Sequence, residues 1–399
     1  MKVAIIGYGV VGSGVYEILK KNAKGIARRA GLELEVGYVL DIRDFPDHPE
    51  KEIFVKDFNI ILNDPDVSVV VETMGGIRFA YEYTKAALES GKSVVTSNKE
   101  LVAAHGHEFF ALAEEHGCRY LYEASVGGGI PIIRPLAHCL AGNEIESVSG
   151  IINGTTNYIL TKMFKNGQTY ESALKEAQEL GYAEKDPTAD VDGHDVCRKI
   201  SILASLCLGK RVDSNNVPTA GIRSITVEDV SYAAILSSSI KLVGYASFKD
   251  GKAGVFVSPM MIPKCNPLAG IDYVNNGIMV KGNMVGECMF YGPGAGKLPT
   301  ASAVVGDIID IAKNSAYIPE FAWTVPDEPA TFDPAEIESK FFVRVRPRGE
   351  DAVRAEFGDV KFISGVSDVG FVTDVMSEKE IDRRLKKVSG FVSKIRMYQ

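Results

Sequence analysis

The chain has 399 residues, of which 46% are hydrophobic and 24% charged, and a formal net charge of −8 at pH 7. At about 150 residues per domain this length predicts two or three globular domains, and the negative charge argues against nucleic acid as a partner. No apolar run reaches the roughly 18 residues of a membrane span, and the first predicted strand starts too early for a signal peptide. The six cysteines are scattered without a CxxC pair. We therefore expect a cytoplasmic protein whose thiols are reduced, small core residues.

The first third of the chain alternates short β-branched runs with helical patterns, which is typical of a parallel sheet with crossover helices. We expect strands at residues 3–6, 34–40, 67–71, 93–96 and 119–123, and helices at 12–21, 80–90 and 108–116. The pattern predicts an α/β fold that begins with a Rossmann-like domain over residues 1–130.

A GxGxxG pattern formed by Gly7, Gly9 and Gly12 follows the first predicted strand. In this pattern the first glycine turns the chain, the second admits a pyrophosphate, and the third lets helix and strand pack closely. Val10 and Val11 open the helix, whose free N–H groups attract phosphate. Strand, glycine turn and helix together predict a bound NAD or NADP.

The end of the second predicted strand carries opposing signals for the choice of dinucleotide. Asp41 would bond a ribose 2′-hydroxyl and favour NAD, whereas Arg43 would bind a 2′-phosphate and favour NADP. The residues alone leave both open.

Residues 131–299 have a mixed pattern that predicts a second α/β domain. It contains expected helices at 170–180 and 193–208, a strand-rich region at 240–290 and a glycine-rich loop at 292–297. A helix expected at about 300–313 has no strand after it. Residues 314–339, rich in proline and acidic residues around 318–334, predict a linker.

The last part of the chain, residues 340–399, reads as a self-contained unit. Its expected order is strand 341–345, helix 351–357, strands 360–363 and 369–375, helix 379–388 and strand 392–397. This βαββαβ order is the ferredoxin-like plan.

Five segments resemble the homoserine dehydrogenase family in order and spacing. They are SNK at 97–99, YEASVGGGIPI at 122–132, GIINGTTNYIL at 150–160, LGYAEKDPTADVDGHD at 180–195 and YGPGAG at 291–296. Together they cover the chain to about residue 313. The resemblance implies a Rossmann domain, a mixed catalytic and dimerisation domain and a late helix that returns to the first domain. It also implies hydride transfer between aspartate 4-semialdehyde and homoserine, a homodimer or homotetramer, and a slight preference for NADP over NAD.

Reduction of an aldehyde needs a hydride from the cofactor and a proton for the developing alkoxide. Lys199 follows Asp195 by four residues on a predicted helix, so both side chains share one face. On spacing alone this is a surface ion pair; by resemblance Lys199 donates the proton, and Asp195 binds substrate. The resemblance also places Lys99 beside nicotinamide and substrate. Further substrate contacts are expected from Glu184, Asp190, Gly154 and Thr155, and further cofactor contacts from Gly181 and Gly296.

Glu123 and the glycine-rich segment after it have two interpretations. In some family members the matching acid and nearby carbonyls hold sodium, which here implies Glu123, Val126, Gly128 and Ile130 as ligands. The alternative is a turn whose glycines permit close packing.

The histidines show no metal-binding or catalytic spacing. His105 and His107 lack an HExxH pattern or a companion cysteine pair, so we expect solvated residues near a helix start. His194 is expected to be incidental.

The C-terminal unit resembles an ACT domain, a kind that often senses amino acids. At residues 347–351 the sequence PRGED replaces the usual D-x-P-G effector turn, and the first helix is short. We therefore expect the unit to pair subunits, with control by threonine as a weaker hypothesis.

Two rival functions are weighed against this resemblance. An aspartate semialdehyde dehydrogenase needs a nucleophilic cysteine at a strand end, and neither Cys118 nor Cys197 has that setting. A nucleotide-binding amino-acid sensor without turnover would not need the lysines expected at the site.

Overall fold

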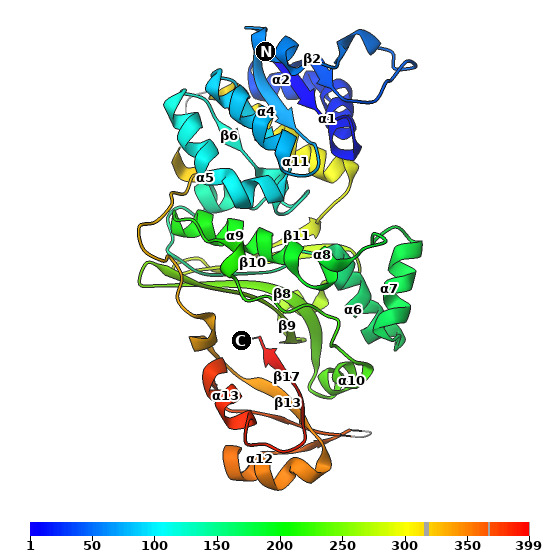
Figure 1. Ribbon diagram of the computed structural model, residues 1–399, viewed down its shortest axis with the longest axis vertical. Coiled ribbons are helices and arrows are strands. Elements are labelled where there is room, and N and C mark those ends of the chain that lie inside the picture. The colour runs from blue at the N-terminus through cyan, green and yellow to red at the C-terminus, as the bar shows by residue number, and fades with distance from the viewer. Residues whose placement is uncertain (315–318, 366–367, 399) are drawn as a thin grey trace.

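The computed structural model describes residues 1–314, 319–365 and 368–398 of the chain. Three parts follow one another along its long axis: a parallel-sheet domain, a mixed domain with long antiparallel strands, and a small C-terminal unit (Figure 1). Helix α11 (Lys297–Lys313) returns from the second part and packs against α1 (Val10–Lys21) of the first.

The N-terminal domain is a six-stranded parallel sheet in the order β3-β2-β1-β4-β5-β6. Its strands are β1 (Lys2–Ile6), β2 (Glu35–Leu40), β3 (Phe54–Val55), β4 (Val67–Glu72), β5 (Ser93–Thr96) and β6 (Tyr120–Leu121). With α1 and α11 they are covered by α2 (Ala23–Ala30), α3 (Phe58–Asn63), α4 (Arg78–Glu89) and α5 (Lys99–Glu115). The strand order reverses between β1 and β4, where open α/β sheets bind ligands. The predicted Rossmann-like fold is confirmed.

Element boundaries in this domain differ from the prediction most at α5 and β6. Helix α5 begins at Lys99, nine residues before the predicted start at 108, and β6 ends before Glu123. The short elements β3, α2 and α3 were not predicted. The glycine in α5 explains part of the difference: a Cβ at Gly106 would lie 2.8 Å from the Trp323 ring. Packing against a distant residue therefore favours a weak helix former at this position.

The second domain is built on an antiparallel sheet with helices on one face (Figure 1). Its strands are β7 (Ile145–Ile151), β8 (Ser238–Lys249), β9 (Lys252–Pro263), β10 (Asn275–Gly282) and β11 (Gly286–Pro293). The helices are α6 (Gly154–Asn166), α7 (Tyr170–Glu179), α8 (Thr188–Val191), α9 (His194–Leu208) and α10 (Val227–Ile235). The predicted helices at 170–180 and 193–208 are confirmed.

The C-terminal unit has the predicted βαββαβ order. Its elements are β13 (Phe341–Val345), α12 (Glu350–Phe357), β14 (Ile363–Ser364), β15 (Val369–Val372), α13 (Glu378–Leu385) and β17 (Phe391–Met397), with a small pair of β12 (Glu338–Ser339) and β16 (Met376–Ser377). The strand order β17-β13-β15-β14 continues the sheet of the second domain, because β17 pairs in parallel with β9. The unit is therefore not self-contained: nine strands form one sheet across both parts, which the sequence does not predict.

The predicted linker is only partly described, because residues 315–318 lie outside the described residues. Beyond them, Phe321 and Trp323 are both 3% exposed, and the Trp323 ring packs edge-on against Phe110 and Tyr122. This segment is thus docked onto the Rossmann domain by two buried aromatic side chains.

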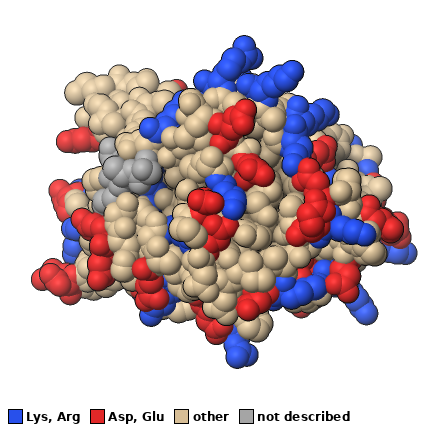
Figure 2. All heavy atoms as spheres, turned by 90° about the horizontal axis from the view of Figure 1, so that it is seen from above, with Lys and Arg blue, Asp and Glu red and all other residues tan. Residues whose placement is uncertain are grey.

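The thiols and the surface bear on the expectations from composition. Cys118 and Cys197 are buried, but Cys139 and Cys265 are exposed, so the expectation of core residues is wrong for these two. Seen from the Rossmann end, acidic and basic side chains are mixed over the surface, and several basic ones stand together at the top of the view (Figure 2). Among the described residues, no helix combines the length and apolarity needed to cross a bilayer.

Candidate active site

The turn after β1 has the geometry that the GxGxxG pattern predicts. Gly7 adopts φ +91°, and a Cβ at Gly12 would lie 1.9 Å from the Gly7 carbonyl oxygen. A Cβ at Gly9 would meet nothing within 4 Å, so the backbone there is open to a ligand. Helix α1 starts at Val10, which is 66% exposed. These features fit a pyrophosphate at the N-terminus of α1.

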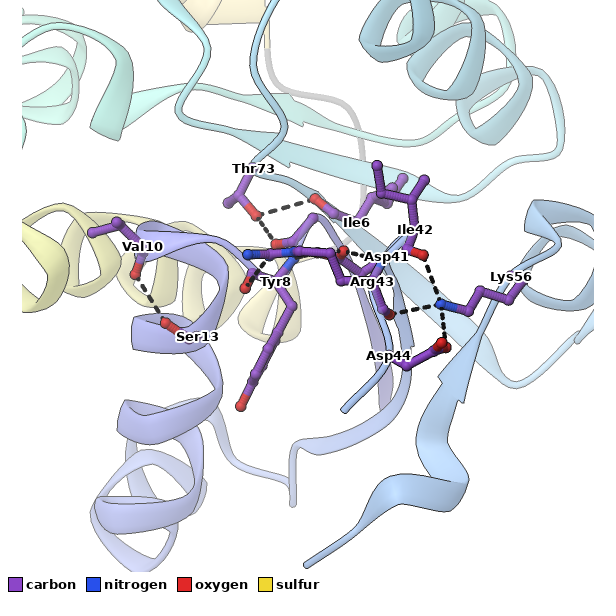
Figure 3. Close-up of polar contacts among 11 residues, drawn as sticks. Ile6, Tyr8, Val10, Ser13, Asp41, Ile42, Arg43, Asp44, Lys56 and Thr73 are labelled. Atoms are coloured by element: carbon purple, nitrogen blue, oxygen red, sulfur yellow. Dashed lines mark hydrogen bonds and ion pairs between the residues drawn. The ribbon is translucent and has the colours of Figure 1, made fainter. Parts of the chain in front are cut away.

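Asp41 and Arg43 bind each other at the end of β2 (Figure 3). The Arg43 guanidinium donates to both carboxylate oxygens, at 3.0 and 2.9 Å, and to the Tyr8 carbonyl at 2.8 Å. The Tyr8 N–H donates to Asp41 at 2.7 Å. Hydrogen bonds from Arg43 lower the pKa of Asp41 to about 2. Asp41 and Arg43, which the sequence predicts to favour different dinucleotides, therefore form one ion pair.

Lys56 adds a second positive charge to this end of the sheet. Its Nζ lies 2.9 Å from the Ile42 oxygen, 2.6 Å from the Arg43 oxygen and 2.9 Å from the Asp44 carboxylate (Figure 3). Sequence reasoning missed Lys56, because the loop after β2 brings it back from 13 residues away.

One carboxylate joins the two predicted catalytic lysines. The Asp195 carboxylate lies 2.8 Å from the Lys199 Nζ and 3.0 Å from the Lys99 Nζ. Lys199 also donates to the Ile152 carbonyl at 2.8 Å. Asp195 and Lys199 are 5% and 9% exposed, so the alternative of a surface ion pair is wrong. Because Lys99 begins α5 of the Rossmann domain, this cluster bridges the two domains.

The charges in the cluster reinforce one another. Burial alone would raise the pKa of Asp195, but the charges of Lys199 and Lys99 outweigh it and hold the pKa well below its usual range. The Asp195 charge raises the pKa of Lys99, although burial opposes it. A carboxylate and a charged Lys99 therefore persist together at neutral pH.

Asn153 organises the carboxylates of the site and was not singled out by sequence reasoning. Its side chain accepts from the Thr156 N–H and caps α6, while its amide donates to Asp190 at 2.7 Å and to Asp195 at 2.9 Å. Burial raises the pKa of Asp190. The available signal was the N-cap position of this asparagine in the NGTTN motif.

Family models and individual relatives were compared with the chain. Residues 7–123 match the model "Homoserine dehydrogenase, NAD binding domain", and residues 131–309 match the model "Homoserine dehydrogenase". The chain is 40% identical to the homoserine dehydrogenase of Bacillus subtilis, covering 92% of this chain and 86% of that protein. It is 38% identical to that of Pseudomonas aeruginosa, covering 96% and 89%. The chain belongs to the homoserine dehydrogenase family.

Solved structures of homoserine dehydrogenases share the fold. The enzyme from Thiobacillus denitrificans matches with a TM-score of 0.91 and 34% identity, covering 100% of this chain and 98% of that one. A hyperthermophilic archaeal homoserine dehydrogenase in complex with NADPH matches with a TM-score of 0.67 and 29% identity, covering 79% and 99%. The chain is thus an NAD(P)-dependent oxidoreductase of amino-acid biosynthesis that interconverts homoserine and aspartate 4-semialdehyde. This confirms the predicted function over the sensor without turnover.

The expected substrate contacts of the homoserine dehydrogenase motifs are only partly brought together. The Thr155 hydroxyl donates to the Tyr182 carbonyl at 2.6 Å, which places the loop before α8 over the start of α6. A Cβ at Gly154 would lie 3.0 Å from the Val274 oxygen. Glu184 is exposed in that loop, and within the described part of the chain its carboxylate forms no hydrogen bond or ion pair.

Two further glycines of the family motifs were expected at the cofactor. Gly181 adopts φ +76°, and a Cβ there would meet nothing within 4 Å. Gly296, at φ +119°, is the N-cap of α11. The loop at residues 292–297, which contains Gly296, packs against the glycine-rich segment at 126–130. The Gly129 N–H donates to the Pro293 oxygen at 3.1 Å. A Cβ at Gly128 would lie 2.2 Å from the Gly294 oxygen.

The Glu123 carboxylate does not fit the predicted role of a sodium ligand. It accepts backbone N–H groups from Ile132 at 2.6 Å, Ile133 at 2.8 Å and Arg134 at 2.9 Å. The Arg134 guanidinium lies 3.5 Å away. These donors already balance its charge, and a cation would face their positive ends. The carboxylate instead caps the helical turn that begins at residue 133.

The expectation of solvated histidines at a helix start is wrong. His105 and His107 lie inside α5, where the His105 Nδ1 contacts the Glu108 carboxylate at 2.8 Å. The His107 side chain is 16% exposed. No group of three or more His, Cys, Asp or Glu able to hold a metal occurs in the described ranges.

Neither buried thiol resembles an acyl-transfer nucleophile. Burial raises the pKa of Cys118 to about 11, and burial also raises the pKa of Cys197. The Cys197 Sγ donates to the Ser214 carbonyl at 3.3 Å. A thiolate is needed for acyl transfer, so the aspartate semialdehyde dehydrogenase alternative gains no support.

Proposed function

We propose that Lys199 exchanges the proton with the substrate oxygen during the homoserine dehydrogenase reaction. The observation that carries this proposal is the sharing of Asp195 by Lys199 and Lys99 at the domain boundary. Two of the three N–H groups of Lys199 point at Asp195 and Ile152, which leaves the third for a ligand. In the direction of aldehyde reduction the Lys199 ammonium donates that proton to the alkoxide.

The same cluster supplies electrostatic stabilisation. The two ammonium groups present positively charged N–H donors beside Asp195, which favours the alkoxide that develops in the transition state. Lys99, kept charged by Asp195, faces this region with a side chain that is 37% exposed. Asp195 thus orients both lysines.

The cofactor supplies or accepts the hydride. Gly7, Gly9 and Gly12 with the start of α1 would hold its pyrophosphate, and Gly296 and Gly181 would line the same cleft. Asp190 and Glu184 would bind the α-ammonium of the substrate, each charge-assisted hydrogen bond giving about 1.5–3 kcal/mol.

One experiment tests the role of Lys199. The Lys199→Ala variant should lower kcat for homoserine oxidation by about 10²- to 10⁴-fold, the range for a general acid or base. Lys175→Ala is the matched control, because Lys175 forms an exposed i,i+4 ion pair on α7. Near-normal turnover of Lys199→Ala would overturn the assignment.

We propose NADP as the preferred cofactor, bound at its 2′-phosphate by Arg43 and Lys56. Asp41 would repel a phosphate, but its charge is neutralised by Arg43, whose guanidinium is held by Asp41 and the Tyr8 carbonyl while the side chain stays 57% exposed to a ligand. Lys56 adds charge beside it. The structural relative in complex with NADPH supports the same choice.

The cofactor proposal is tested by kinetics with both dinucleotides. Arg43→Ala should lower kcat/KM for NADP by about 10- to 100-fold, the loss of a charge-assisted hydrogen bond, and change NAD kinetics less. Arg29→Ala, an exposed arginine on α2, serves as the control. Equal losses with both cofactors would contradict a 2′-phosphate contact.

Assembly and effectors are further proposals. We propose a homodimer or homotetramer of a cytoplasmic enzyme; the edge strand β11 exposes Met289 and Tyr291, as an interface strand would. Light scattering of the purified chain measures this. Threonine at the C-terminal unit stays a prediction, tested by titrating threonine into the assay. Sodium binding also stays a prediction. Because the Glu123 carboxylate is occupied by N–H donors, the ion would be bound by the main-chain oxygens of Val126, Gly128 and Ile130 alone.

A further inference from the structure

Glu72, the last residue of β4, is a buried carboxylate that the reaction described above does not use. It is 0% exposed. Its Oε1 accepts the Met74 N–H at 2.8 Å, and its Oε2 accepts the Thr96 hydroxyl at 2.6 Å. Across the described residues no lysine, arginine or histidine forms an ion pair with it. A buried charge without a counter-ion costs free energy, so we looked to its hydrogen-bond partners for a function.

Hydrogen bonds lead from Glu72 to the start of α5. The Thr96 hydroxyl that donates to Glu72 also accepts the Asn98 N–H at 2.9 Å. The Asn98 side chain accepts from the Leu101 N–H at 3.1 Å, which caps α5, and donates to the Gly76 oxygen at 2.7 Å. Lys99 is the first residue of that helix. The position of Lys99 therefore depends on Thr96 and Asn98.

The turn after Glu72 also contacts the cofactor turn. The Thr73 hydroxyl lies 2.8 Å from the Gly7 oxygen and 3.1 Å from the Ile6 oxygen (Figure 3). Glu72 thus sits between the first glycine turn and the lysine helix, at the carboxyl ends of β4 and β5. It links the two structures that must be aligned for hydride transfer.

We propose that Glu72 is a positioning residue that holds Lys99 against Asp195 through Thr96 and Asn98, and that it does so only as a carboxylate. The proposal rests on the proposed role of Lys99. Both Glu72 oxygens face donors, and an ionised carboxylate is acceptor-only. A proton on Oε1 would point at the Met74 N–H, and two donors cannot form a hydrogen bond with each other. A proton on Oε2 would force the Thr96 hydroxyl to accept and leave its own hydrogen unpaired.

The surroundings of Glu72 make its protonation state sensitive to pH. Burial raises its pKa to about 7, against the lowering effect of Thr96, the Met74 N–H and Asn98. The titratable group that feels its charge is Tyr120 of β6, whose pKa is raised by burial and then by Glu72. Lys99 of α5 lies beyond Asn98 and pairs with Asp195. Proton uptake below about pH 7 therefore releases Thr96.

The test is the pH profile of kcat/KM for aspartate 4-semialdehyde with NADPH, the direction in which the Lys199 ammonium is the proton donor, measured on the wild type and Glu72→Gln. We expect the wild type to lose activity as the pH falls through about 7. Glutamine presents an NH₂ donor group at every pH, so the variant should be about 10- to 100-fold slower, with a rate that does not change across this range, as for a misplaced catalytic group. A variant that keeps the acidic limb of the wild type would overturn the proposal.

Two further measurements separate positioning from a general loss of structure. Thr96→Val should reproduce the slow, flat profile of Glu72→Gln, and Thr96→Ser, which keeps the hydroxyl, should restore both rate and limb. Infrared spectra of the cofactor-free protein should show a protonated carboxyl band that titrates near pH 7 in the wild type and is missing in Glu72→Gln. Identical spectra of the two proteins would contradict the proposal.

Lys99→Ala distinguishes this proposal from the assignment of Lys99. Turnover of Lys99→Ala at the wild-type rate would overturn the role of Lys99 and this proposal with it. If Lys99→Ala is impaired but Glu72→Gln behaves as the wild type, only the positioning role of Glu72 is overturned.

Discussion

Two buried ion clusters of opposite composition lie at the two boundaries between the parts of this molecule. At the Rossmann boundary one carboxylate, Asp195, is shared by the ammonium groups of Lys99 and Lys199. At the C-terminal boundary one guanidinium, Arg344, is shared by two carboxylates, one from α10 and one from the loop before β15. Each cluster joins two parts, but only the first has the properties of a reaction site.

The difference lies in access, because an unpaired donor is present in both clusters: one N–H of Lys199 in the first and the buried Nε of Arg344 in the second. The Lys99 side chain is 37% exposed, so a ligand can reach the first cluster from this side. In the other cluster Arg344 is 7% exposed and binds Asp229 at 2.7 Å and Asp368 at 2.8 Å. A cluster closed on all sides can only hold the C-terminal unit in place, whereas an open one can bind and react.

The largest expected effect tests the open cluster. Asp195→Asn removes the shared counter-ion, so Lys199 loses its orientation, and kcat should fall by about 10²- to 10⁴-fold. The free energy of unfolding should fall less than for the closed cluster, because Lys99 can turn toward water. Steady-state kinetics and urea unfolding measure the two quantities. A stable variant with normal kcat would contradict a catalytic role for the shared carboxylate.

The closed cluster should respond in the opposite way. Arg344→Met leaves two buried carboxylates without a cation and should lower the free energy of unfolding by about 3–5 kcal/mol. The kcat of the folded enzyme should stay within about threefold. Arg354→Met, at an arginine with a 50% exposed side chain in the same unit, is the control. A large loss of kcat with little change in stability would contradict a purely structural role.

A third buried cluster, around Asp307, has fewer cations for each carboxylate than the cluster around Asp195. Asp307 lies 2.6 Å from a single arginine, Arg134, and beside Glu123. Burial raises its pKa, unlike that of Asp195 with two lysines. A raised carboxyl pKa contributes stability below its ordinary value of about 4, and this is lost as the pH rises through the raised value.

The corresponding prediction compares Asp307→Asn with the wild type at two pH values. Asparagine does not titrate, so the variant should gain stability relative to the wild type on going from about pH 4 to about pH 8. Thermal unfolding at both values measures the difference. A change of the opposite sign would show that Arg134 outweighs burial at this carboxylate.

The smallest expected effect concerns the sheet junction. The hydroxyl of Tyr398, the residue after β17, lies 2.7 Å from the hydroxyl of Ser149 in β7. Tyr398→Phe should lower the free energy of unfolding by about 0.5–1.5 kcal/mol, the usual contribution of one buried hydrogen bond, and leave kcat unchanged. Unfolding in urea measures it, and a reduced kcat would mean that the junction acts on the active site.

Features set by neighbours in the sequence were predicted correctly. The glycine turn at Gly7 and the pair Asp195–Lys199 depend on local backbone geometry and helix periodicity, which a few adjacent residues encode. The βαββαβ order of the C-terminal unit also follows from alternating local patterns. Predicted element boundaries were wrong where packing against a distant residue determines the structure, as in α5, where Gly106 packs against Trp323.

By itself the sequence determined the family, the domain order and which side chains carry charge at the site. Tertiary structure alone decided their partners: that Lys99 meets Asp195, that Arg43 neutralises Asp41, and that the backbone N–H groups after residue 131 capture Glu123. The physical reason is that a buried charged side chain pairs with the opposite charge or N–H group that folding places next to it. Contacts between segments far apart in the chain leave no periodic signal in either one.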